Sequence, residues 1–435
     1  MKFPTEVLRN GRLWLIVLVL ALSESRLALA EGLFENVEVE IDTTFRTEVE
    51  SFENFEWTPD LDDTYYLQRL LVDIDLRFSD QLRFFAQPIH ALSADKDDVA
   101  PPDEDRLDVQ QLYLEWEAAE RVRSRIGRQE FRLGKERLIS RRFGPNVPRV
   151  FDGGRVTVFE ALEDTTIDLF YLQEVRSRFD VFDNPVFSDV NRLWGLYSTT
   201  EDLLPGESDI DLYYLGTSFE TSHLPFVTGN REDRYSFGSR IFGKNDSGFD
   251  WDLEGVFQTG TVGSRDIQAW TVASEIGFLL EHAKFTPRFA LKTSISSGDQ
   301  GDPLNGTIET FSPLFPKGDY FSESAAIGPY NHIELHPTLS LALSDKSQLF
   351  LQWNHLWRQS TDDAIYDVPG FPLRNGQTSD ARYIGNEVSV TLDHQLTERI
   401  SLQLACSHFV TGAFIEETGQ SPNLTFGKIS MSIDF

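Results

Sequence analysis

The residues best suited to chemistry in this chain form a basic block between Arg121 and Arg155. This stretch carries eleven of the 39 cationic side chains and only three acids, while the whole chain has a net charge of −31. Arginine binds carboxylates well, because its planar guanidinium can donate two parallel hydrogen bonds to one acid. The segregation of charge therefore predicts a site that attracts and orders anions.

Alternation indicates how part of this block is positioned. Arg121, Arg123 and Arg125 alternate with less polar neighbours, so the three guanidinium groups share one face of a predicted β-strand. Similar segments recur along nearly the whole chain, separated by clusters of Asp, Gly, Asn and Pro, and they predict about eighteen strands (16–18). The predicted strands are 37–49, 65–78, 81–92, 107–116, 121–130, 155–162, 166–175, 192–200, 209–219, 234–242, 249–259, 268–280, 283–296, 333–343, 348–357, 387–395, 400–410 and 424–435.

The two ends of the chain indicate where these strands would fold. Residues 427–435 alternate strictly between polar and apolar and end on Phe435, like the closing strand of bacterial outer-membrane β-barrels. A basic segment, the apolar run 13–22 and Ala28-Leu29-Ala30 are typical of a secretory signal peptide. We therefore predict a cleaved signal peptide over residues 1–30 and an all-β fold over residues 31–435, a single antiparallel transmembrane β-barrel in the bacterial outer membrane.

Composition excludes a helical membrane protein. No apolar run after residue 22 reaches the ~20 residues that a membrane helix needs, and mean hydropathy is −0.30. A β-barrel tolerates such a composition because only alternate residues of each strand face lipid. The single cysteine, Cys406, excludes a disulfide within the chain.

In a barrel, the arginine row should face the lumen or lie at a mouth, because each cation on the lipid face costs about 2–4 kcal/mol near the midplane. Two interpretations follow. Acids on the neighbouring strand, such as Glu115 and Glu117, neutralise the row, or the row forms an electropositive constriction of the kind that selects anions.

Two sequence blocks give a more specific resemblance. The first lies between Arg125 and Arg155 and reads R-x-G-R-Q-E, then G-P-N-V-x-R, then F-D-G-x-R. The second, residues 311–321, reads F-S-P-L-F-P-K-G-D-Y-F. Together they resemble the signature regions of the alginate-export family of bacterial outer-membrane barrels, in which Asn is usual where Ser312 stands here. The acidity of the rest of the chain is a departure, because an acidic lumen would repel alginate.

The resemblance implies a monomeric barrel of about 18 strands. The best-known members conduct the polyanionic polysaccharide alginate through an arginine-rich pore. The candidate pore-lining and anion-binding residues then fall into two groups. Those carried over by motif are Arg125, Arg128, Arg137, Arg149 and Arg155. Those that rest on parity and density alone are Arg121, Arg123, Arg132, Arg141 and Arg142.

Patterns for catalysis and metal binding are missing from the sequence. None of the eight histidines lies in a G-x-S-x-G or H-E-x-x-H context. His332 and His336 would lie ~13 Å apart on one strand, too far to share a metal ion. We therefore expect no catalytic residues, no metal and no cofactor.

Three functions remain open at this point. The first is a channel that passes an anionic saccharide, an alginate-like polyuronate or a smaller acidic solute, by passive diffusion through an arginine-rich lumen. The second is a less selective porin for neutral or cationic solutes with a self-neutralised lumen, and the third is a barrel enzyme or adhesin. The expected partners are outer-membrane lipid, lipopolysaccharide and the transported anion, with no nucleic acid.

Overall fold

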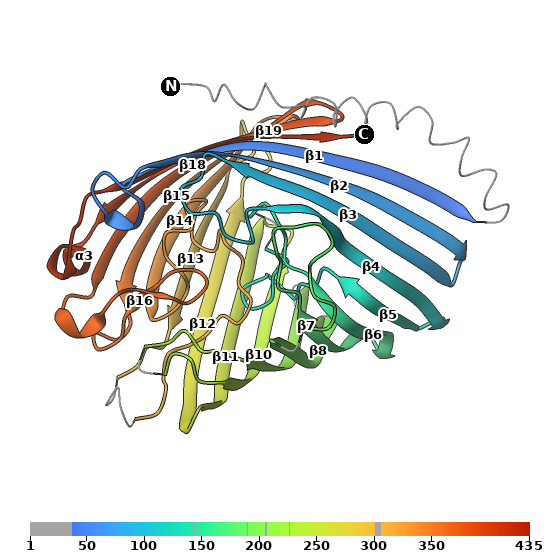
Figure 1. The fold of residues 1–435 in the computed structure, drawn as a ribbon, viewed down its shortest axis with the longest axis horizontal. Coiled ribbons are helices and arrows are strands. Elements are labelled where there is room, and N and C mark those ends of the chain that lie inside the picture. The colour runs from blue at the N-terminus through green and yellow to red at the C-terminus, as the bar shows by residue number, and fades with distance from the viewer. Residues whose placement is uncertain (1–36, 143, 189, 205–206, 226, 301–305) are drawn as a thin grey trace.

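The computed structural model describes residues 37–435 except 143, 189, 205–206, 226 and 301–305. Its main sheet has eighteen strands (Figure 1). β1 (Glu38–Glu53) pairs antiparallel with both β2 (Asp63–Ser79) and β20 (Leu424–Asp434), so the sheet closes on itself into a barrel. Each predicted strand overlaps one of these eighteen, which confirms the predicted fold class. The predicted signal peptide lies outside the described residues.

The other barrel strands pair with their neighbours in sequence order. They are β3 (Leu82–Ala94), β4 (Asp105–Ala119), β5 (Val122–Gln129), β6 (Phe151–Leu162), β7 (Thr165–Glu174), β8 (Asn191–Leu204), β9 (Ser208–Phe219), β10 (Glu232–Lys244), β11 (Phe249–Val262), β12 (Arg265–Leu279), β13 (Arg288–Ser296), β14 (His332–Ser344), β15 (Ser347–Arg358), β18 (Tyr383–Thr397) and β19 (Ile400–Thr411). The loops contain η1 (Phe55–Trp57), β16 (Ile365–Tyr366), β17 (Pro372–Arg374), η2 (Gly376–Thr378) and α3 (Ala413–Thr418). None of the helices in the described ranges is long and apolar enough to cross a membrane.

In this barrel the distribution of polar and apolar side chains is the reverse of that in a soluble protein. On β4, Leu114 and Trp116 are 42% and 53% exposed, whereas Glu115 between them is 9% exposed. On β20, Ile429 is 52% exposed and Ser430 only 7%. Because apolar side chains line the outer face and polar ones the interior, the outer face suits a hydrocarbon environment.

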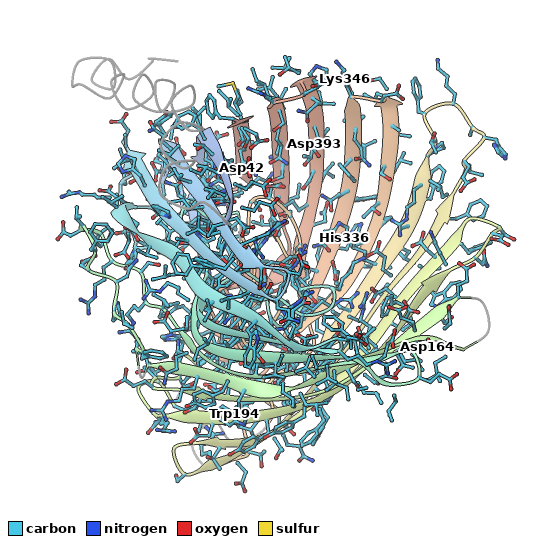
Figure 2. The ribbon with its side chains drawn as sticks, turned by 90° about the vertical axis from the view of Figure 1, so that its right-hand side faces the viewer. Asp42, Asp164, Trp194, His336, Lys346 and Asp393 are labelled. Atoms are coloured by element: carbon cyan, nitrogen blue, oxygen red, sulfur yellow. The ribbon has the colours of Figure 1, made fainter. Side chains whose placement is uncertain are left out.

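The two ends of the barrel differ. Short turns such as 80–81, 120–121 and 345–346 join strands at one end, whereas most connections at the other end are long loops. The start of β1 and the end of β20 also lie at the short-turn end (Figure 1). Figure 2 shows Asp42 and Asp393 near this end of their strands, with Lys346 in its turn and His336 farther along β14.

Two long loops occupy the interior. We call the described residues of 130–150 the first inner loop and the described residues of 297–331 the second inner loop. They pair through the backbone, since Ser140 N donates to Phe315 O and Phe315 N donates to Leu138 O, both at 2.9 Å. Phe315 packs edge-on against Phe151 of β6, with ring centroids 5.2 Å apart. An apolar core therefore joins both inner loops to the barrel wall and holds them across the lumen.

Candidate functional site

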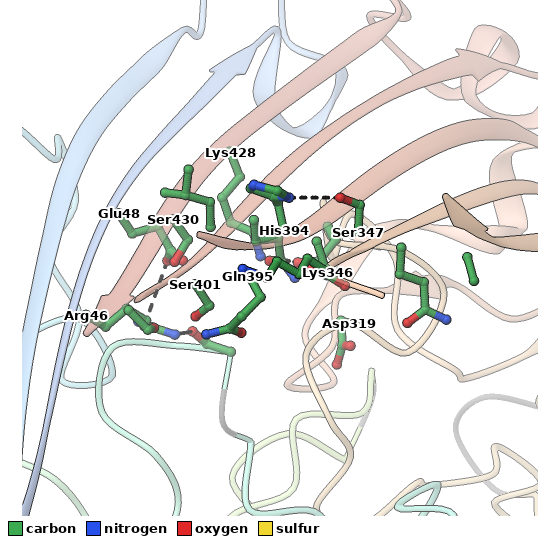
Figure 3. A pocket seen from close by; sticks show the side chains of 18 of the residues that line it. Arg46, Glu48, Asp319, Lys346, Ser347, His394, Gln395, Ser401, Lys428 and Ser430 are labelled. Carbon is green, nitrogen blue, oxygen red and sulfur yellow. Dashed lines mark hydrogen bonds and ion pairs between the residues drawn. The ribbon is translucent and has the colours of Figure 1, made fainter. Parts of the chain in front are cut away.

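A cavity of about 1020 Å³ (Figure 3) reaches the short-turn end of the barrel, where Asp345 and Lys346 of the turn between β14 and β15 line it. The two inner loops close its far side, and β1, β14, β15, β18, β19 and β20 contribute its wall. We call it the inner cavity. Its cations are Arg46, Lys135, Arg141, Lys317, Lys346 and Lys428. Its acids are Glu48, Glu136, Asp319, Glu323, Asp345 and Asp393. The two signs balance across this lining.

Many of the inner-cavity charges are paired. Arg46 lies 3.8 Å from Glu48 on the same strand, as Figure 3 shows, and Lys428 forms an ion pair with Glu323 of the second inner loop. Arg141 lies 3.4 Å from Glu130, whose pKa is raised by burial. The inner cavity is thus a polar chamber with cations and acids held close together, and it is not uniformly cationic.

A second cavity of about 260 Å³ lies beyond the inner loops, at the long-loop end. We call it the outer cavity. Among the described residues, Arg142, Arg149 and Arg176 line it, together with two acids, Glu174 and Glu232. Arg141 lines the inner cavity and Arg142 the outer one, although they are adjacent in the chain. The first inner loop therefore presents guanidinium groups to both sides of the partition.

The outer cavity holds two partly buried guanidinium groups. Arg149 Nε donates to Glu174 at 2.9 Å, and Arg149 Nη1 donates to Pro316 O at 3.2 Å. Among the described residues no acid forms an ion pair with Arg142, and its Nε atom is buried without a hydrogen-bond partner. Burial and the charge of Arg149 lower the pKa of Arg142 to about 10, so the group stays cationic at neutral pH. An anion in this cavity would relieve both the desolvation and the repulsion.

The arginine row of β5 is neutralised by acids on the neighbouring strands. Nη2 of Arg123 lies 2.7 Å from Glu117, and Nη2 of Arg125 lies 2.5 Å from Glu115. Arg155 of β6, the register neighbour of Arg125, lies 2.8 Å from Asp168 of β7. These three arginines line neither cavity. They form the self-neutralised arrangement that the sequence left open.

Three further candidates of the basic block, Arg121, Arg132 and Arg137, lie in different parts of the structure. Arg121 is an exposed turn residue 2.8 Å from Glu160, and Arg132 is exposed and 3.2 Å from Glu136. Arg137 is bound between Asp252 and Glu254 of β11, at 2.8 and 2.7 Å, so it anchors the first inner loop. None of these three arginines lines either cavity.

Arg128 lies on the other face of β5 from Arg125, the face that carries the exposed Ile126. Its Nε donates to Asp152 at 2.9 Å and its Nη2 donates to Pro185 O at 2.8 Å. The structure therefore places this motif residue away from both cavities, where it holds loop 175–190 against the end of the wall. The physical reason is parity, because residues an odd number apart on a strand point to opposite faces.

Other motif residues hold the first inner loop in place. Asn146 is fully buried, and its Nδ2 donates to the carbonyls of Gln68, Leu92 and Asp103 at 2.9–3.1 Å. Arg69 of β2, also buried, donates to Pro145 O at 3.2 Å. The structure shows a loop fastened to the wall by side chain to backbone bonds.

We expect Asn146→Ala to destabilise the barrel by about 1–3 kcal/mol, because three buried carbonyls lose a donor. Urea unfolding of the protein in lipid vesicles measures this change. Asn146→Asp is the informative companion, because it keeps the shape but turns an acceptor toward the same carbonyls, and it should be worse than Ala. Wild-type stability in the Asp variant would show that donation is not the role of this side chain.

A pair of acids links the second inner loop to loop 359–382. Asp299 N donates to Asp363 Oδ2 at 2.9 Å, and Ser360 Oγ donates to Asp299 O at 2.6 Å. Burial raises the pKa of Asp299 from 3.8 to about 6, with a further contribution from Asp363. Burial also raises the pKa of Asp363. A carboxyl whose pKa is raised by folding favours the folded loop most when it is protonated.

We therefore expect this loop contact to weaken as the pH rises from about 4 through about 6, and to change little above that range. Hydrogen exchange over residues 359–367, corrected for the intrinsic rate at each pH, measures it. Asp299→Asn should flatten the dependence, whereas Asp246→Asn, in a turn at the other end, should not. An unchanged pH dependence of hydrogen exchange in Asp299→Asn would show that a group other than Asp299 is responsible for it.

Sequence reasoning missed the inner-cavity cations outside the basic block. Arg46, Lys317, Lys346 and Lys428 come from segments far apart in the chain. Lys428 had a usable signal, because it belongs to the polar face of the C-terminal strand and that face turns inward. The others carry no local signal that separates them from surface cations. In the described part of the chain, no group of three or more His, Cys, Asp or Glu side chains is arranged to hold a metal ion.

Comparison with known proteins agrees with this architecture. The family described as Alginate export matches residues 36–425. A BenF-like porin from Pseudomonas fluorescens Pf-5 is 10% identical with a TM-score of 0.64, covering 92% of this chain and 98% of its own. Pseudomonas aeruginosa OccK2 (OpdF) in complex with glucuronate is 12% identical with a TM-score of 0.62, over the same shares of the two chains. Acinetobacter baumannii OccAB1 is 10% identical with a TM-score of 0.60, over 91% and 96%. No curated protein sequence matches this chain.

Proposed function

Because the chain belongs to the alginate-export family and is an outer-membrane β-barrel channel, we propose that it passes anionic saccharides by passive diffusion. The solute would be an alginate-like polyuronate or a smaller acidic sugar. Family and fold are those of porin channels rather than of enzymes. The proposal concerns which solutes cross and which side chains lower their barrier.

The observation that carries the proposal is the partition of the lumen by the first inner loop. Arg141 meets the inner cavity, while Arg142 and Arg149 meet the outer one. A carboxylate that leaves one cavity would therefore find a guanidinium on either side of the loop. Rings or rows of such groups lower the barrier for anions, and exchange between several weak sites lets the solute leave again.

The acids of the inner cavity fit this role. Glu48 and Glu323 lie close to Arg46 and Lys428, two cations of the same lining. They would compete with a bound carboxylate and so keep its residence short. One neighbour in fold, OccK2, is described in complex with glucuronate, which is a uronate like the units of alginate. This likeness supports a uronate-class solute.

A less selective porin is the second candidate. The equal numbers of cations and acids in the inner cavity favour it, and so do the paired Arg123, Arg125 and Arg155. Such a lumen would pass neutral sugars and small cations about as readily as anions. The two candidates differ in the sign of ion selectivity.

The deciding experiment is a planar-bilayer recording of the mature chain under a salt gradient. We expect a reversal potential that favours anions, and reversible block by oligomers of a uronic acid but not by neutral oligosaccharides of equal length. Cation selectivity without uronate block would sink the proposal and leave the less selective porin.

A further inference from the structure

The loop between β7 and β8 carries a run of exposed apolar side chains at the long-loop end of the barrel. They are Phe179, Val181, Phe182, Val186 and Phe187, of which Val186 is the most exposed, at 73%. We call residues 179–187 the outer strap. We propose that the outer strap inserts into the lipid of the outer leaflet, in the layer between the hydrocarbon core and water. This inference does not depend on which solute passes through the lumen.

The outer strap is fastened to the lipid-facing side of the wall. Arg128 of β5 and Asp152 of β6 are register partners on the face that also carries the exposed Ile126. Arg128 Nη2 donates to Pro185 O at 2.8 Å, and Phe187 N donates to Asp152 Oδ2 at 2.9 Å. The outer strap therefore continues the surface that already contacts lipid, and apolar patches of this kind mark contacts with lipid or a partner.

The polar groups of the outer strap turn toward the wall. Asn184 N donates to Asp108 Oδ2 at 3.0 Å, and Asn184 Nδ2 donates to Asp105 Oδ2 at 2.8 Å. Phe182 N donates to Leu107 O at 2.8 Å. Backbone groups at membrane depth need such partners within the protein, because lipid tails offer none. With polar groups inward and apolar side chains outward, the outer strap is amphipathic in the sense that a membrane interface requires.

Strand register gives the level of the outer strap relative to the membrane. In register across β5 to β8 stand Ile126, Gly154, Tyr171 and Trp194. Tyrosine and tryptophan are typical of the boundary between hydrocarbon and headgroups. Arg128 lies two residues farther toward the long loops, which is ~7 Å along the strand and ~5 Å along the membrane normal at the usual tilt. The layer outside the hydrocarbon core is about 5–8 Å thick on each side, so the outer strap falls within it.

The outer strap also covers charges that would otherwise face this layer. Arg128 lies 2.9 Å from Asp152 and 3.7 Å from Asp108, and all three side chains are almost fully buried. The backbone of Phe182 (φ 50°) and Phe187 (φ 51°) is left-handed, which is uncommon for bulky residues. Both rings stay outward in spite of this conformation, as apolar surroundings favour. The long loops of outer-membrane barrels are extracellular, so the surrounding lipid is that of the outer leaflet.

Site-directed spin labelling of the mature chain, folded in lipid vesicles, tests the proposal. A nitroxide is attached to Phe182→Cys or Val186→Cys, each in a chain that also carries Cys406→Ala. Power saturation measures collisions of the label with O₂, which concentrates in lipid, and with a neutral nickel chelate, which stays in water. We expect the ratio of O₂ to nickel collisions at both positions to be several-fold higher than at Asp98→Cys/Cys406→Ala, an exposed position in the loop between β3 and β4.

The wild-type chain provides the lipid reference, because its single cysteine, Cys406, is exposed on the outer face of β19. The two strap positions should give ratios between those of Asp98→Cys and Cys406. Ratios equal to that of Asp98→Cys would place the outer strap in water and overturn the proposal. Few collisions with either reagent, together with dipolar broadening between labels on neighbouring chains, would also overturn it, because the outer strap would then contact a second copy. Heat-modifiable gel migration confirms folding, and Val181→Cys replaces either position if that variant does not fold.

Discussion

Replacing Arg142 and Arg149 together with glutamine should remove most of the preference for anions. Both guanidinium groups line the outer cavity, where the acids among the described lining residues are Glu174 and Glu232. Two unit charges about 4 Å apart interact by about 4 kcal/mol at an effective dielectric constant near 20. Since the loss of only a third of that energy changes an equilibrium about tenfold, we expect the anion-to-cation permeability ratio to fall by about tenfold or more.

The reversal potential under a salt gradient measures this ratio. Arg123→Gln/Arg125→Gln is the matched control, because it also removes two arginines of the basic block, but these are paired with Glu117 and Glu115 and line neither cavity. The control should change the ratio little. If the control and the outer-cavity variant shift the potential equally, the block acts through its total charge, and the outer cavity has no special role.

The single variants separate the two arginines. Arg149 has an acid partner in Glu174 and also donates to Pro316 O, so its loss removes a loop contact as well as a charge. Arg142 has no acid partner among the described residues. We therefore expect Arg142→Gln to change selectivity with little loss of stability, and Arg149→Gln to change both.

Arg240→Met should be among the most destabilising single substitutions in the barrel. The Arg240 guanidinium lies 2.9 Å from Asp211 and 2.6 Å from Asp252, and both acids are almost fully buried. Removal of one partner from such a network leaves buried charge without compensation, which costs about 3–5 kcal/mol. Asp211 would keep only its hydrogen bonds from Tyr197 and Thr199.

Urea unfolding in lipid vesicles measures this loss. Arg231→Met is the matched control, because Arg231 is exposed and its ion pair with Asp233 is screened by water, so the expected change is at most about 1 kcal/mol. A second variant, Arg240→Met/Asp211→Asn, should recover part of the stability by removing one stranded charge. Equal stability of Arg240→Met and the wild type would show that water or the other cations already compensate these acids.

Much of the fold follows from local pattern. Period-two alternation locates strands such as β4 and β20, because a residue on a strand in a membrane can meet only lipid or lumen and the two demand opposite polarities. Boundaries were less accurate, since β1 runs to Glu53 and β18 starts at Tyr383, beyond the clear alternation of residues 37–49 and 387–395. Near the loops, both faces of these strands carry a mixture of polar and apolar residues, so alternation does not mark where the strand begins or ends.

Local pattern likewise predicted some features of the candidate site and missed others. Parity correctly separated the face of Arg123 and Arg125 from that of Ile126, but it could not show that Glu117 and Glu115 take up both charges. For Arg141 and Arg142 the sequence offered parity and density alone, and parity does not apply to them because these residues lie in a loop without regular alternation. Their assignment to opposite cavities depends on Phe315, almost 175 residues away in the chain, which pairs with the first inner loop.

The sequence by itself determined the class of this protein, the approximate number of its strands and the concentration of arginine in one block. These properties are local, since each strand must satisfy lipid on one face and water on the other whatever its partners are. Only the tertiary structure decided which arginines reach the lumen. That choice rests on contacts between distant segments, such as Asn146 with three wall carbonyls and Arg137 with Asp252, and on how the acids of neighbouring strands fall in register. A charged side chain acts on a passing solute only when no oppositely charged side chain lies nearer to it than the solute does. In a barrel, the closed sheet determines which side chains from distant segments are neighbours.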